Sequence, residues 1–376
     1  MAAVRSVKLI VLGIGGVGRG LLRQIVRLRA LHAERYGLAL CVVALADSSG
    51  LLAAEGGHMT DELINSVLEA KAAGLALREF DGCLPLASPN ELSAALRPRL
   101  VAGTLLVDCS ATEATTSALI DALRLGCSIV LANKKPLTTT QEAFDRLTRA
   151  GATEGMLDLS RIRYETTCGA GLPVIGTLQR LLASGDRVER VAGTFSGTLG
   201  YVMTGLQEGR LFSEVVREAH ALGYTEPDPR DDLGGLDVAR KALILARTIG
   251  WQLELDDIAV QGLYPPEMGA LSVAEFMARL PQLDGFFAAQ VEKAADEGGT
   301  LRYAAVVNDG LSSVGPTIVS QESPLGRLRG TGNLIEFHSD WYSPSPLVVQ
   351  GPGAGVDVTT AGVLSDIMEL ALARPA

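Results

Sequence analysis

The sequence predicts an α/β protein with a doubly wound parallel sheet followed by a second, α+β domain. Three observations predict this class. Short apolar segments alternate with helical patterns over residues 1–150, as in a parallel sheet covered by helices. The first apolar segment runs directly into a glycine-rich turn. Strand-like segments without intervening helices follow residue 300, which indicates an antiparallel sheet.

The composition describes a globular protein and excludes several function classes. Apolar residues make up 47% of the 376-residue chain and charged residues 20%, and the net charge of −10 argues against nucleic acid or an anionic membrane as partner. The five cysteines form no CxxC pair and the four histidines form no zinc-ligand cluster. No apolar run approaches the ~20 residues of a membrane span. We expect reduced thiols and a cytoplasmic protein.

The first strand and its turn carry the clearest binding motif. Residues 7–12 (VKLIVL) lead into G-x-G-x-x-G and a long helical pattern. Gly13 permits a tight turn, Gly15 lets a pyrophosphate approach the backbone, and Gly18 lets helix and strand pack closely. A phosphate then lies at the helix N-terminus, beside the backbone of Gly16 and Val17. The motif predicts a Rossmann-type nucleotide site; a glycine-rich turn without a ligand is the alternative.

The second strand, residues 40–46, ends at Asp47. A carboxylate at this strand end binds the ribose 2′-hydroxyl of NAD and repels the 2′-phosphate of NADP. Asp47 can equally cap the turn formed by Ser48 and Ser49. Both interpretations stay open.

Two further strands, residues 104–108 and 127–132, are followed by CSAT and NKKP. Ligands of doubly wound sheets bind at the carboxyl ends of the strands, where Ser110 and Lys134 would then lie. A solvated lysine after a strand is the alternative for Lys134.

Residues 222–241, LGYTEPDPRDDLGGLDVARK, are the most unusual stretch of the chain. Two prolines make its first half a loop, and carboxylates crowd it. From residue 236 an apolar helical pattern runs to Gly250, with Asp237 and Lys241 four residues apart on one face. A buried lysine beside a carboxylate indicates a proton-handling site. A surface ion pair behind a solvated loop is the alternative.

The wording of this stretch, YTEPDPRDDLGGLDVARK, closely resembles the signature of the homoserine dehydrogenases. The resemblance implies interconversion of L-homoserine and L-aspartate 4-semialdehyde with NAD or NADP. It makes Lys241 the proton donor, oriented by Asp237, with Lys134 as a second cation facing nicotinamide and substrate. Glu226 and Asp232 would hold the substrate ammonium group.

The resemblance extends over nearly the whole chain. DCSAT resembles the cofactor-contacting segment with Ser110, and GPGAG places Gly355 beside the cofactor. Residues 164–177 resemble a loop that binds a monovalent cation such as Na⁺ through four residues: Glu165 and the carbonyls of Cys168, Ala170 and Leu172. A hard cation prefers such oxygen ligands.

By the family's fold, residues 1–150 form a nucleotide-binding domain completed by residues 340–376, and residues 151–339 carry substrate and, in a homodimer, the partner contact. Only about 21 residues follow GPGAG, enough for one helix. We therefore expect the short, monofunctional type without a C-terminal regulatory domain.

Two rival functions remain. A related aspartate-pathway dehydrogenase acting on an aldehyde needs a nucleophilic cysteine activated by a base, and no cysteine here has an adjacent histidine in sequence. A non-enzymatic nucleotide sensor would keep the glycine turn but have no need of the Asp237–Lys241 pair.

Overall fold

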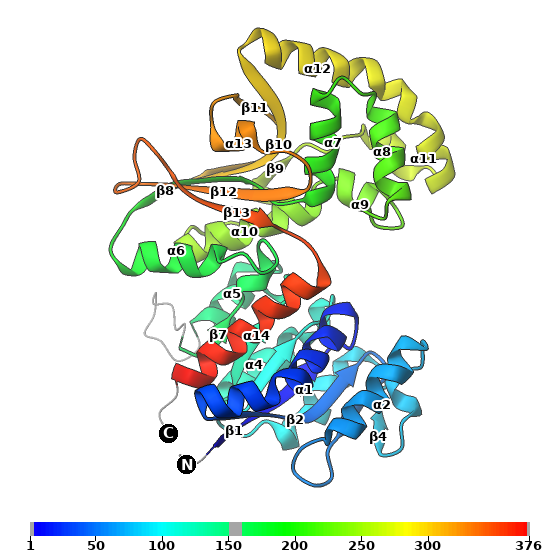
Figure 1. Ribbon diagram of the computed structural model, residues 1–376, viewed down its shortest axis with the longest axis vertical. Coiled ribbons are helices and arrows are strands. Elements are labelled where there is room, and N and C mark those ends of the chain that lie inside the picture. Colours follow the sequence, from blue (N-terminus) through cyan, green and yellow to red (C-terminus); the bar gives the residue numbers. More distant parts are fainter. Residues whose placement is uncertain (1–3, 150–159, 374–376) are drawn as a thin grey trace. The chain divides into compact units, whose positions relative to one another are not determined.

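The computed structural model describes residues 4–149 and 160–373, which form two compact units (Figure 1). Unit 1 comprises Met1–Thr167 and Gly355–Ala376, and unit 2 comprises Cys168–Ala354. The first boundary falls at residue 167 instead of 150, because residues 162–163 pair into the sheet of unit 1. The second boundary falls at residue 354 instead of 339, because residues 347–352 form a strand of the sheet of unit 2.

Unit 1 is built on a seven-stranded sheet in the order β4-β3-β2-β1-β5-β6-β7. Its strands are β1 (Arg5–Leu12), β2 (Leu38–Asp47), β3 (Gly50–Ala53), β4 (Cys83–Pro85), β5 (Leu105–Asp108), β6 (Ser128–Leu131) and β7 (Ile162–Arg163). Five of these strands, β2, β1, β5, β6 and β7, run parallel, as the sequence predicted. The chain adds β3 and β4 as an antiparallel edge beyond β2, which sequence analysis missed.

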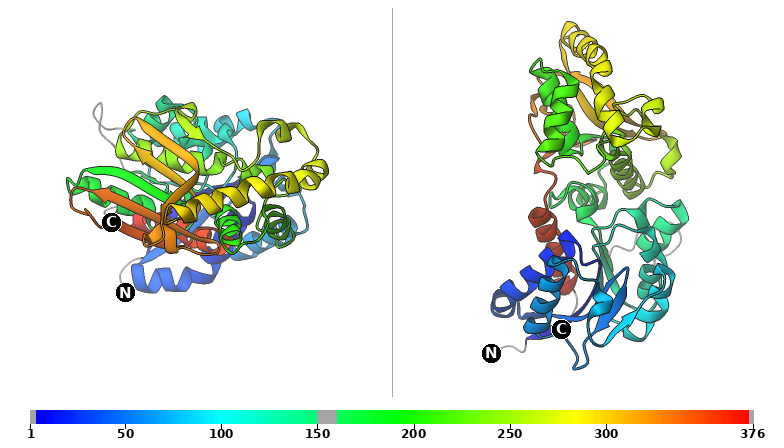
Figure 2. Two further views of the ribbon diagram at one scale, coloured as in Figure 1. Left: turned by 90° about the horizontal axis from the view of Figure 1, so that it is seen from above. Right: turned by 90° about the vertical axis from the view of Figure 1, so that its right-hand side faces the viewer.

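Helices cover both faces of this sheet (Figures 1 and 2). They are α1 (Gly16–Tyr36), α2 (Asp61–Ala72), α3 (Leu92–Leu96), α4 (Thr116–Arg124), α5 (Gln141–Thr148) and α14 (Val356–Ala373). Helix α14 packs beside α1, so the C-terminal segment completes this unit. The core joins the apolar strand residues to α1, α2 and α14 through Leu21, Ile25, Ile64 and Ile367.

The strand order places a topological switch point between β1 and β5. The chain leaves β1 toward β2 on one side and returns to β5 on the other. The turns after these strands therefore part in opposite directions and leave a crevice at the carboxyl ends, which is where ligands of such sheets bind. The glycine turn and the CSAT segment follow these two strands.

Unit 2 is built on a six-stranded sheet in the order β13-β12-β8-β10-β11-β9. Its strands are β8 (Val188–Thr194), β9 (Ile258–Val260), β10 (Gly299–Asn308), β11 (Leu311–Ser320), β12 (Gly332–Ser339) and β13 (Leu347–Pro352). All neighbours pair antiparallel except β11 and β9. The antiparallel second sheet is thus confirmed.

The helices of unit 2 are α6 (Val174–Ala183), α7 (Gly197–Gln207), α8 (Phe212–Ala221), α9 (Arg230–Leu233), α10 (Leu236–Ile249), α11 (Val273–Arg279), α12 (Asp284–Asp296) and α13 (Pro324–Arg327). Helix α10 packs against β10, β11 and α6, and its apolar residues from Ala242 to Ala246 are fully buried. It ends at Gly250 in the left-handed conformation, at the predicted stop.

Candidate active site

The glycine turn after β1 has the geometry that its sequence predicts. Gly13 adopts a φ of +84°, and a Cβ there would lie 2.6 Å from the Ser110 nitrogen. A Cβ at Gly18 would lie 2.0 Å from the Gly13 oxygen, so α1 can approach the strand only with glycine at this position. At Gly15, the N-cap of α1, no atom lies within 4 Å of an added Cβ.

The start of α1 suits an anion. Its first turn contains Gly16 and Val17 and carries no acidic residue, and no side chain caps it in the described part of the chain. Unpaired N–H groups and the helix dipole favour a phosphate at such an end. The dinucleotide pyrophosphate therefore fits the residues present.

The GPGAG segment returns to this turn. A Cβ at Gly16 would lie 3.3 Å from a methyl group of Val356, the first residue of α14. Gly355, immediately before it, has a φ of +119° and no atom within 4 Å of an added Cβ in the described residues. Gly355 thus lies next to the N-terminal turn of α1, within the same unit.

Asp47 is held in a turn at the end of β2. Its Oδ1 accepts hydrogen bonds from the backbone and hydroxyl of Ser49 at 2.8 and 2.6 Å, and its Oδ2 lies 2.8 Å from Lys71 Nζ. Burial opposes ionisation, but the hydrogen bonds from Lys71 and Ser49 leave the pKa of Asp47 below its usual value. The turn-capping interpretation is realised. The Lys71 partner, on α2, had no signal in the sequence.

Ser110 and Lys134 follow neighbouring strands of the same sheet edge. The two segments are tied together by Asn133, whose side-chain amide reaches Ser110 Oγ at 3.1 Å and Asp108 Oδ2 at 3.0 Å. Lys134 is partly exposed at the start of a short turn of helix. The glycine turn, Ser110 and Lys134 thus share the carboxyl edge of the sheet, as expected.

In unit 2, Lys241 is buried in α10, with an exposed fraction of 8%. Its Nζ lies 2.8 Å from Asp237 Oδ2 and donates to the Phe195 carbonyl at 2.6 Å. Asp237 lies one turn earlier, at the exposed N-terminal end of the helix. Two acceptors thus orient the ammonium group: the Asp237 carboxylate on the same helix and the Phe195 carbonyl just before α7. This is the arrangement expected of a proton-handling site.

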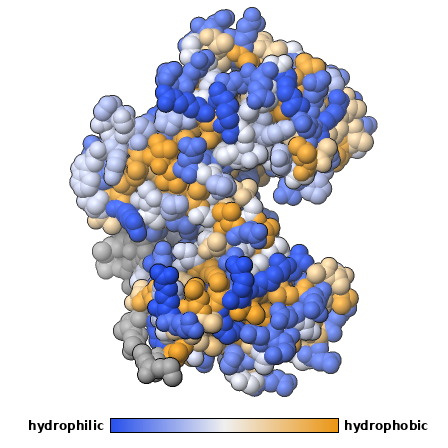
Figure 3. Space-filling model, in the orientation of Figure 1, coloured by the Kyte–Doolittle hydropathy of each residue, from blue (hydrophilic) through white to orange (hydrophobic). Residues whose placement is uncertain are grey.

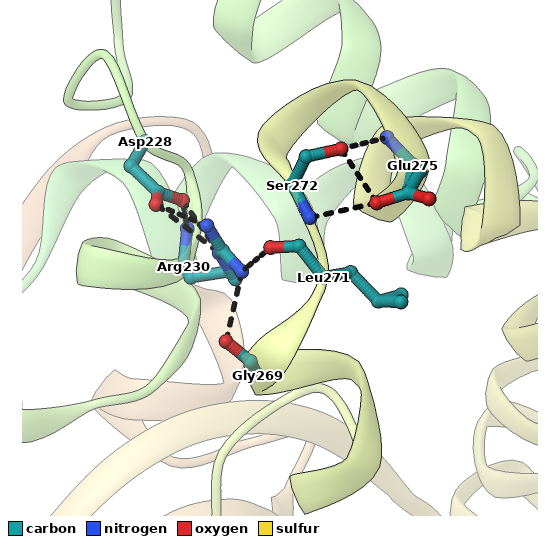
Figure 4. Close-up of polar contacts among 6 residues, drawn as sticks. All are labelled: Asp228, Arg230, Gly269, Leu271, Ser272 and Glu275. Carbon is teal, nitrogen blue, oxygen red and sulfur yellow. Dashed lines mark hydrogen bonds and ion pairs between the residues drawn. The ribbon is translucent and has the colours of Figure 1, made fainter.

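The acidic loop before α10 is fixed by Arg230 (Figure 4). The guanidinium binds both carboxylate oxygens of Asp228 and donates to the carbonyls of Gly269 and Leu271. A capping box between Ser272 and Glu275 starts α11 directly after these carbonyls. Arg230 therefore docks the loop on the segment before α11 and limits its freedom.

Glu226 and Asp232 are joined within this loop. Glu226 is exposed, and its backbone N–H donates to Asp232 Oδ2 at 2.8 Å. The Thr198 hydroxyl, at the start of α7, contacts Asp232 Oδ1 at 3.2 Å and also donates to the Tyr224 carbonyl. Burial, followed by the neighbouring charges of Glu226 and Asp237, raises the pKa of Asp232 above its usual value. Thr198 was missed because its contacts join segments about 30 residues apart.

The residues expected to bind a cation fall in both units. Glu165 belongs to unit 1, where its backbone N–H donates to Asp366 on α14 at 3.1 Å. Cys168, Ala170 and Leu172 belong to unit 2, and Ala170 has a φ of +55°, rare for a residue with a Cβ.

Residues 4–149 and 160–373 contain no group of three or more His, Cys, Asp or Glu side chains that could hold a metal ion. No helix in this part of the chain is long and apolar enough to cross a membrane.

Known proteins resemble this chain along almost its whole length. It is 37% identical to a bifunctional aspartokinase/homoserine dehydrogenase of Haemophilus influenzae over 97% of this chain and 43% of that protein. The chain thus spans about two fifths of the length of such bifunctional relatives. A homoserine dehydrogenase of Emericella nidulans is 36% identical over 96% of this chain and 97% of its own length.

Solved structures share the fold. A Candida auris protein of unknown function superposes with a TM-score of 0.83 and 32% identity, covering 97% of this chain and 98% of that one. A mutant of a hyperthermophilic archaeal homoserine dehydrogenase, solved with NADPH, gives a TM-score of 0.72 and 25% identity over 99% of both chains.

Two family descriptions match successive parts of the chain. The description "Homoserine dehydrogenase, NAD binding domain" matches residues 13–157, which contain the glycine turn and Lys134. The description "Homoserine dehydrogenase" matches residues 173–368, which contain the acidic loop and α10. With its dinucleotide turn in one unit and its oriented lysine in the other, the chain belongs to the homoserine dehydrogenase family.

Proposed function

We propose that this chain catalyses the NAD(P)-dependent interconversion of L-homoserine and L-aspartate 4-semialdehyde, within the aspartate pathway to threonine, methionine and isoleucine. The observation that carries the proposal is the placement of Lys241. Its ammonium group is buried in an otherwise apolar helix and is oriented by Asp237 and the Phe195 carbonyl.

Lys241 acts at the oxygen of the reacting carbon. When bound, the nicotinamide cofactor supplies a hydride to the aldehyde carbon, or removes it from the alcohol carbon. During reduction negative charge develops on the carbonyl oxygen, and a positioned ammonium group stabilises it and donates a proton. In the direction of oxidation Lys241 accepts that proton. Asp237 holds the ammonium group in place.

The acidic loop supplies the site for the substrate ammonium group. Glu226 is an exposed carboxylate residue of this loop. Both oxygens of Asp232 already accept hydrogen bonds, so Asp232 contributes by fixing Glu226 and by adding negative charge. The role of Lys134 as a second cation at the substrate oxygen rests on the family resemblance.

Ser110, Asp47 and Gly355 complete the proposed cofactor site with the glycine turn. NADPH binding by an archaeal relative supports use of NADP, and the ion pair of Asp47 with Lys71 reduces the repulsion that a lone carboxylate would exert on a 2′-phosphate. We further propose Na⁺ as a bound cation, held by Glu165 and the carbonyls of Cys168, Ala170 and Leu172. The left-handed backbone at Ala170 supports a specialised turn there.

We propose a homodimer as the working assembly. Apolar side chains gather where β12 and β13 lie (Figure 3), and the edge strand β13 is only partly covered at its residues Leu347, Val348 and Val349. Trp341, just before it, is 62% exposed. An apolar, unpaired sheet edge is a surface that a second copy can cover. The net charge of −10 supports the absence of a nucleic-acid partner, and the five free cysteines support a cytoplasmic location.

The rival chemistry with a cysteine nucleophile finds no support. A nucleophile must form the thiolate readily. Burial raises the pKa of the Cys83 and Cys109 thiols, and the Cys168 thiol lies 3.5 Å from the Lys241 carbonyl in the core.

Turnover of homoserine with NAD or NADP by the purified protein tests the proposal. We expect Lys241→Met to lower kcat by about two orders of magnitude or more, as loss of a general acid does, while the cofactor Kd stays nearly unchanged. The matched control is Lys293→Met, which removes another i,i+4 ion pair, with Glu297, on the exposed face of α12. Near-normal turnover by folded Lys241→Met would reject the assigned proton donor.

A further inference from the structure

A buried carboxylate lies beneath the cofactor edge of unit 1. Asp108, the last residue of β5, is fully buried. Its Oδ1 accepts the backbone N–H of Ser110 at 2.9 Å. Its Oδ2 accepts the Thr115 hydroxyl at 2.7 Å and the side-chain amide of Asn133 at 3.0 Å. Donors from the segment after β5 and from Asn133 therefore converge on one side chain.

Asn133 connects the Asp108 carboxylate to the turn that contains Lys134. Its amide group also donates to the Thr112 carbonyl at 2.7 Å, and its Oδ1 accepts the backbone N–H of Lys135 at 3.1 Å. This last bond closes a turn around Lys134, because an asparagine side chain that binds the N–H two residues on mimics a backbone turn. The position of the Lys134 backbone thus depends on the side chain of Asn133, which Asp108 orients.

The same network bears on the glycine turn. An added Cβ at Gly13 would lie 2.6 Å from the Ser110 nitrogen and 2.7 Å from the Cys109 carbonyl carbon. The Ser110 backbone is therefore fixed between the glycine turn on one side and the Asp108 carboxylate on the other. A small shift of this backbone would displace both the turn and the Ser110 side chain.

The donor–acceptor pattern requires a carboxylate. All three partners can donate, and a carboxylate accepts with both oxygens. An asparagine at position 108 has nearly the same shape but one donor in place of an acceptor. That NH₂ group would face either the Ser110 N–H or the NH₂ group of Asn133, and neither of these can accept a hydrogen bond. A buried donor facing another donor is costly.

We infer that Asp108 is a positioning residue, which holds the Ser110 segment and the Lys134 turn in the arrangement that binds the nicotinamide cofactor. The expected effect on turnover rests on the proposed function. The expected effect on cofactor binding rests only on the contacts of Asp108 at the carboxyl edge of the sheet of unit 1. Asp108 itself touches neither cofactor nor substrate in this role.

The test compares Asp108→Asn and Thr115→Val with Thr148→Val. The control replaces another buried threonine of the same unit, and it too removes a hydroxyl hydrogen bond, to the Phe144 carbonyl. NADPH affinity is measured by titration of cofactor fluorescence, kcat and KM by homoserine turnover, and Tm by calorimetry. A purely structural role would lower Tm in all three variants and leave NADPH affinity unchanged.

We expect Asp108→Asn to raise the NADPH Kd roughly tenfold or more, the size of effect that a lost buried hydrogen bond produces. Thr115→Val should raise it less, and Thr148→Val not at all. Wild-type NADPH affinity in folded Asp108→Asn overturns the inference. If Asp108→Asn does not fold, the comparison of Thr115→Val with Thr148→Val decides, and equal affinities overturn it.

The two hypotheses fail differently. Wild-type protein that binds NADPH but does not turn over homoserine overturns the proposed function, while the Kd values of the variants still decide the role of Asp108. Normal wild-type turnover with unchanged Kd in the variants overturns only the inference.

Discussion

At the scale of single residues, burial separates two ion pairs that look alike in sequence. Lys241–Asp237 and Lys293–Glu297 both have i,i+4 spacing on helices. The Lys241 side chain is 11% exposed and Lys293 is 62% exposed. An exposed pair contributes little because water screens it, whereas a buried ammonium group keeps a fixed direction. Only the first pair has the environment of a proton donor.

Asp47 gives a prediction on cofactor choice. We expect Asp47→Ser to raise the ratio of kcat/KM for NADP to that for NAD by about tenfold. The substitution removes a negative charge and leaves the Lys71 ammonium group able to bind a 2′-phosphate. The control is Asp61→Ser, which breaks the ion pair with Arg29 in the same unit. An unchanged ratio in Asp47→Ser would show that the 2′ position lies elsewhere.

At the scale of elements, α10 depends on glycine at its start. Gly235, its N-cap, has a φ of +76°, and an added Cβ would lie 1.9 Å from the Tyr303 hydroxyl. Gly250, its C-cap, also has a positive φ, but no atom of the described residues lies within 4 Å of its added Cβ. An alanine at Gly235 would therefore meet both backbone strain and a steric clash, whereas an alanine at Gly250 would meet backbone strain alone.

We predict that Gly235→Ala lowers the free energy of unfolding by about 2–4 kcal/mol, since strain and overpacking add. Gly250→Ala should cost only about 1 kcal/mol, the strain alone. Urea unfolding of both variants measures the difference. Equal losses would mean that Tyr303 moves away without cost.

Helix α14 gives a prediction on pH. Asp366 is buried on this helix, and burial, followed by the neighbouring Glu165 carboxylate, raises its pKa well above the ordinary value. The folded protein therefore holds a proton that the unfolded chain releases above a pKa of about 3.9. Folding stability then falls as pH rises from there through the folded-state pKa, because the folded state binds more protons.

We expect Asp366→Asn to raise Tm at neutral pH and to lose this advantage as the pH falls below about 4, where both states are protonated in the wild type. Asp357→Asn, at the exposed start of the same helix, is the control. Calorimetry from about pH 3.5 to about pH 8 measures the Tm of both variants across the titration of this carboxyl group. A Tm gain independent of pH would contradict the assignment.

At the scale of the whole molecule, the proposed cofactor-binding residues and the proposed proton donor belong to two units with separate sheets. The dinucleotide turn, Ser110 and Lys134 belong to unit 1, and the acidic loop and Lys241 belong to unit 2. Each unit has its own strand order and its own buried core. Ligands that bind one unit should therefore protect that unit first.

Hydrogen exchange tests this division. We predict that NADPH slows amide exchange at residues 13–19, 108–116 and 131–137 and leaves β10 and β11 unchanged, because a ligand protects the segments whose opening its binding opposes. Mass spectrometry of peptides with and without NADPH measures it. Protection confined to β10 and β11 would place the cofactor site in unit 2.

Local patterns in the sequence determined much of this protein. The strand–turn–helix of residues 7–18, the central strands of both sheets, and the helix Leu236–Ile249 depend on the spacing of apolar residues and glycines over short distances. The acidic loop with its two prolines is equally local. Such features survive in any context that buries the apolar face, so the fold class and the positions of the main motifs could be predicted.

Tertiary structure alone decided which side chains meet. The contacts of Lys71 with Asp47, of Thr198 with Asp232 and of Asn133 with Asp108 join residues 24 to 34 positions apart. The same holds for the β3–β4 edge and for the placement of β13 in unit 2. Contacts of this kind follow from how sheets and helices pack, and packing across separate segments leaves no periodic pattern in the chain. The burial of Lys241 has the same origin, since it depends on what covers α10.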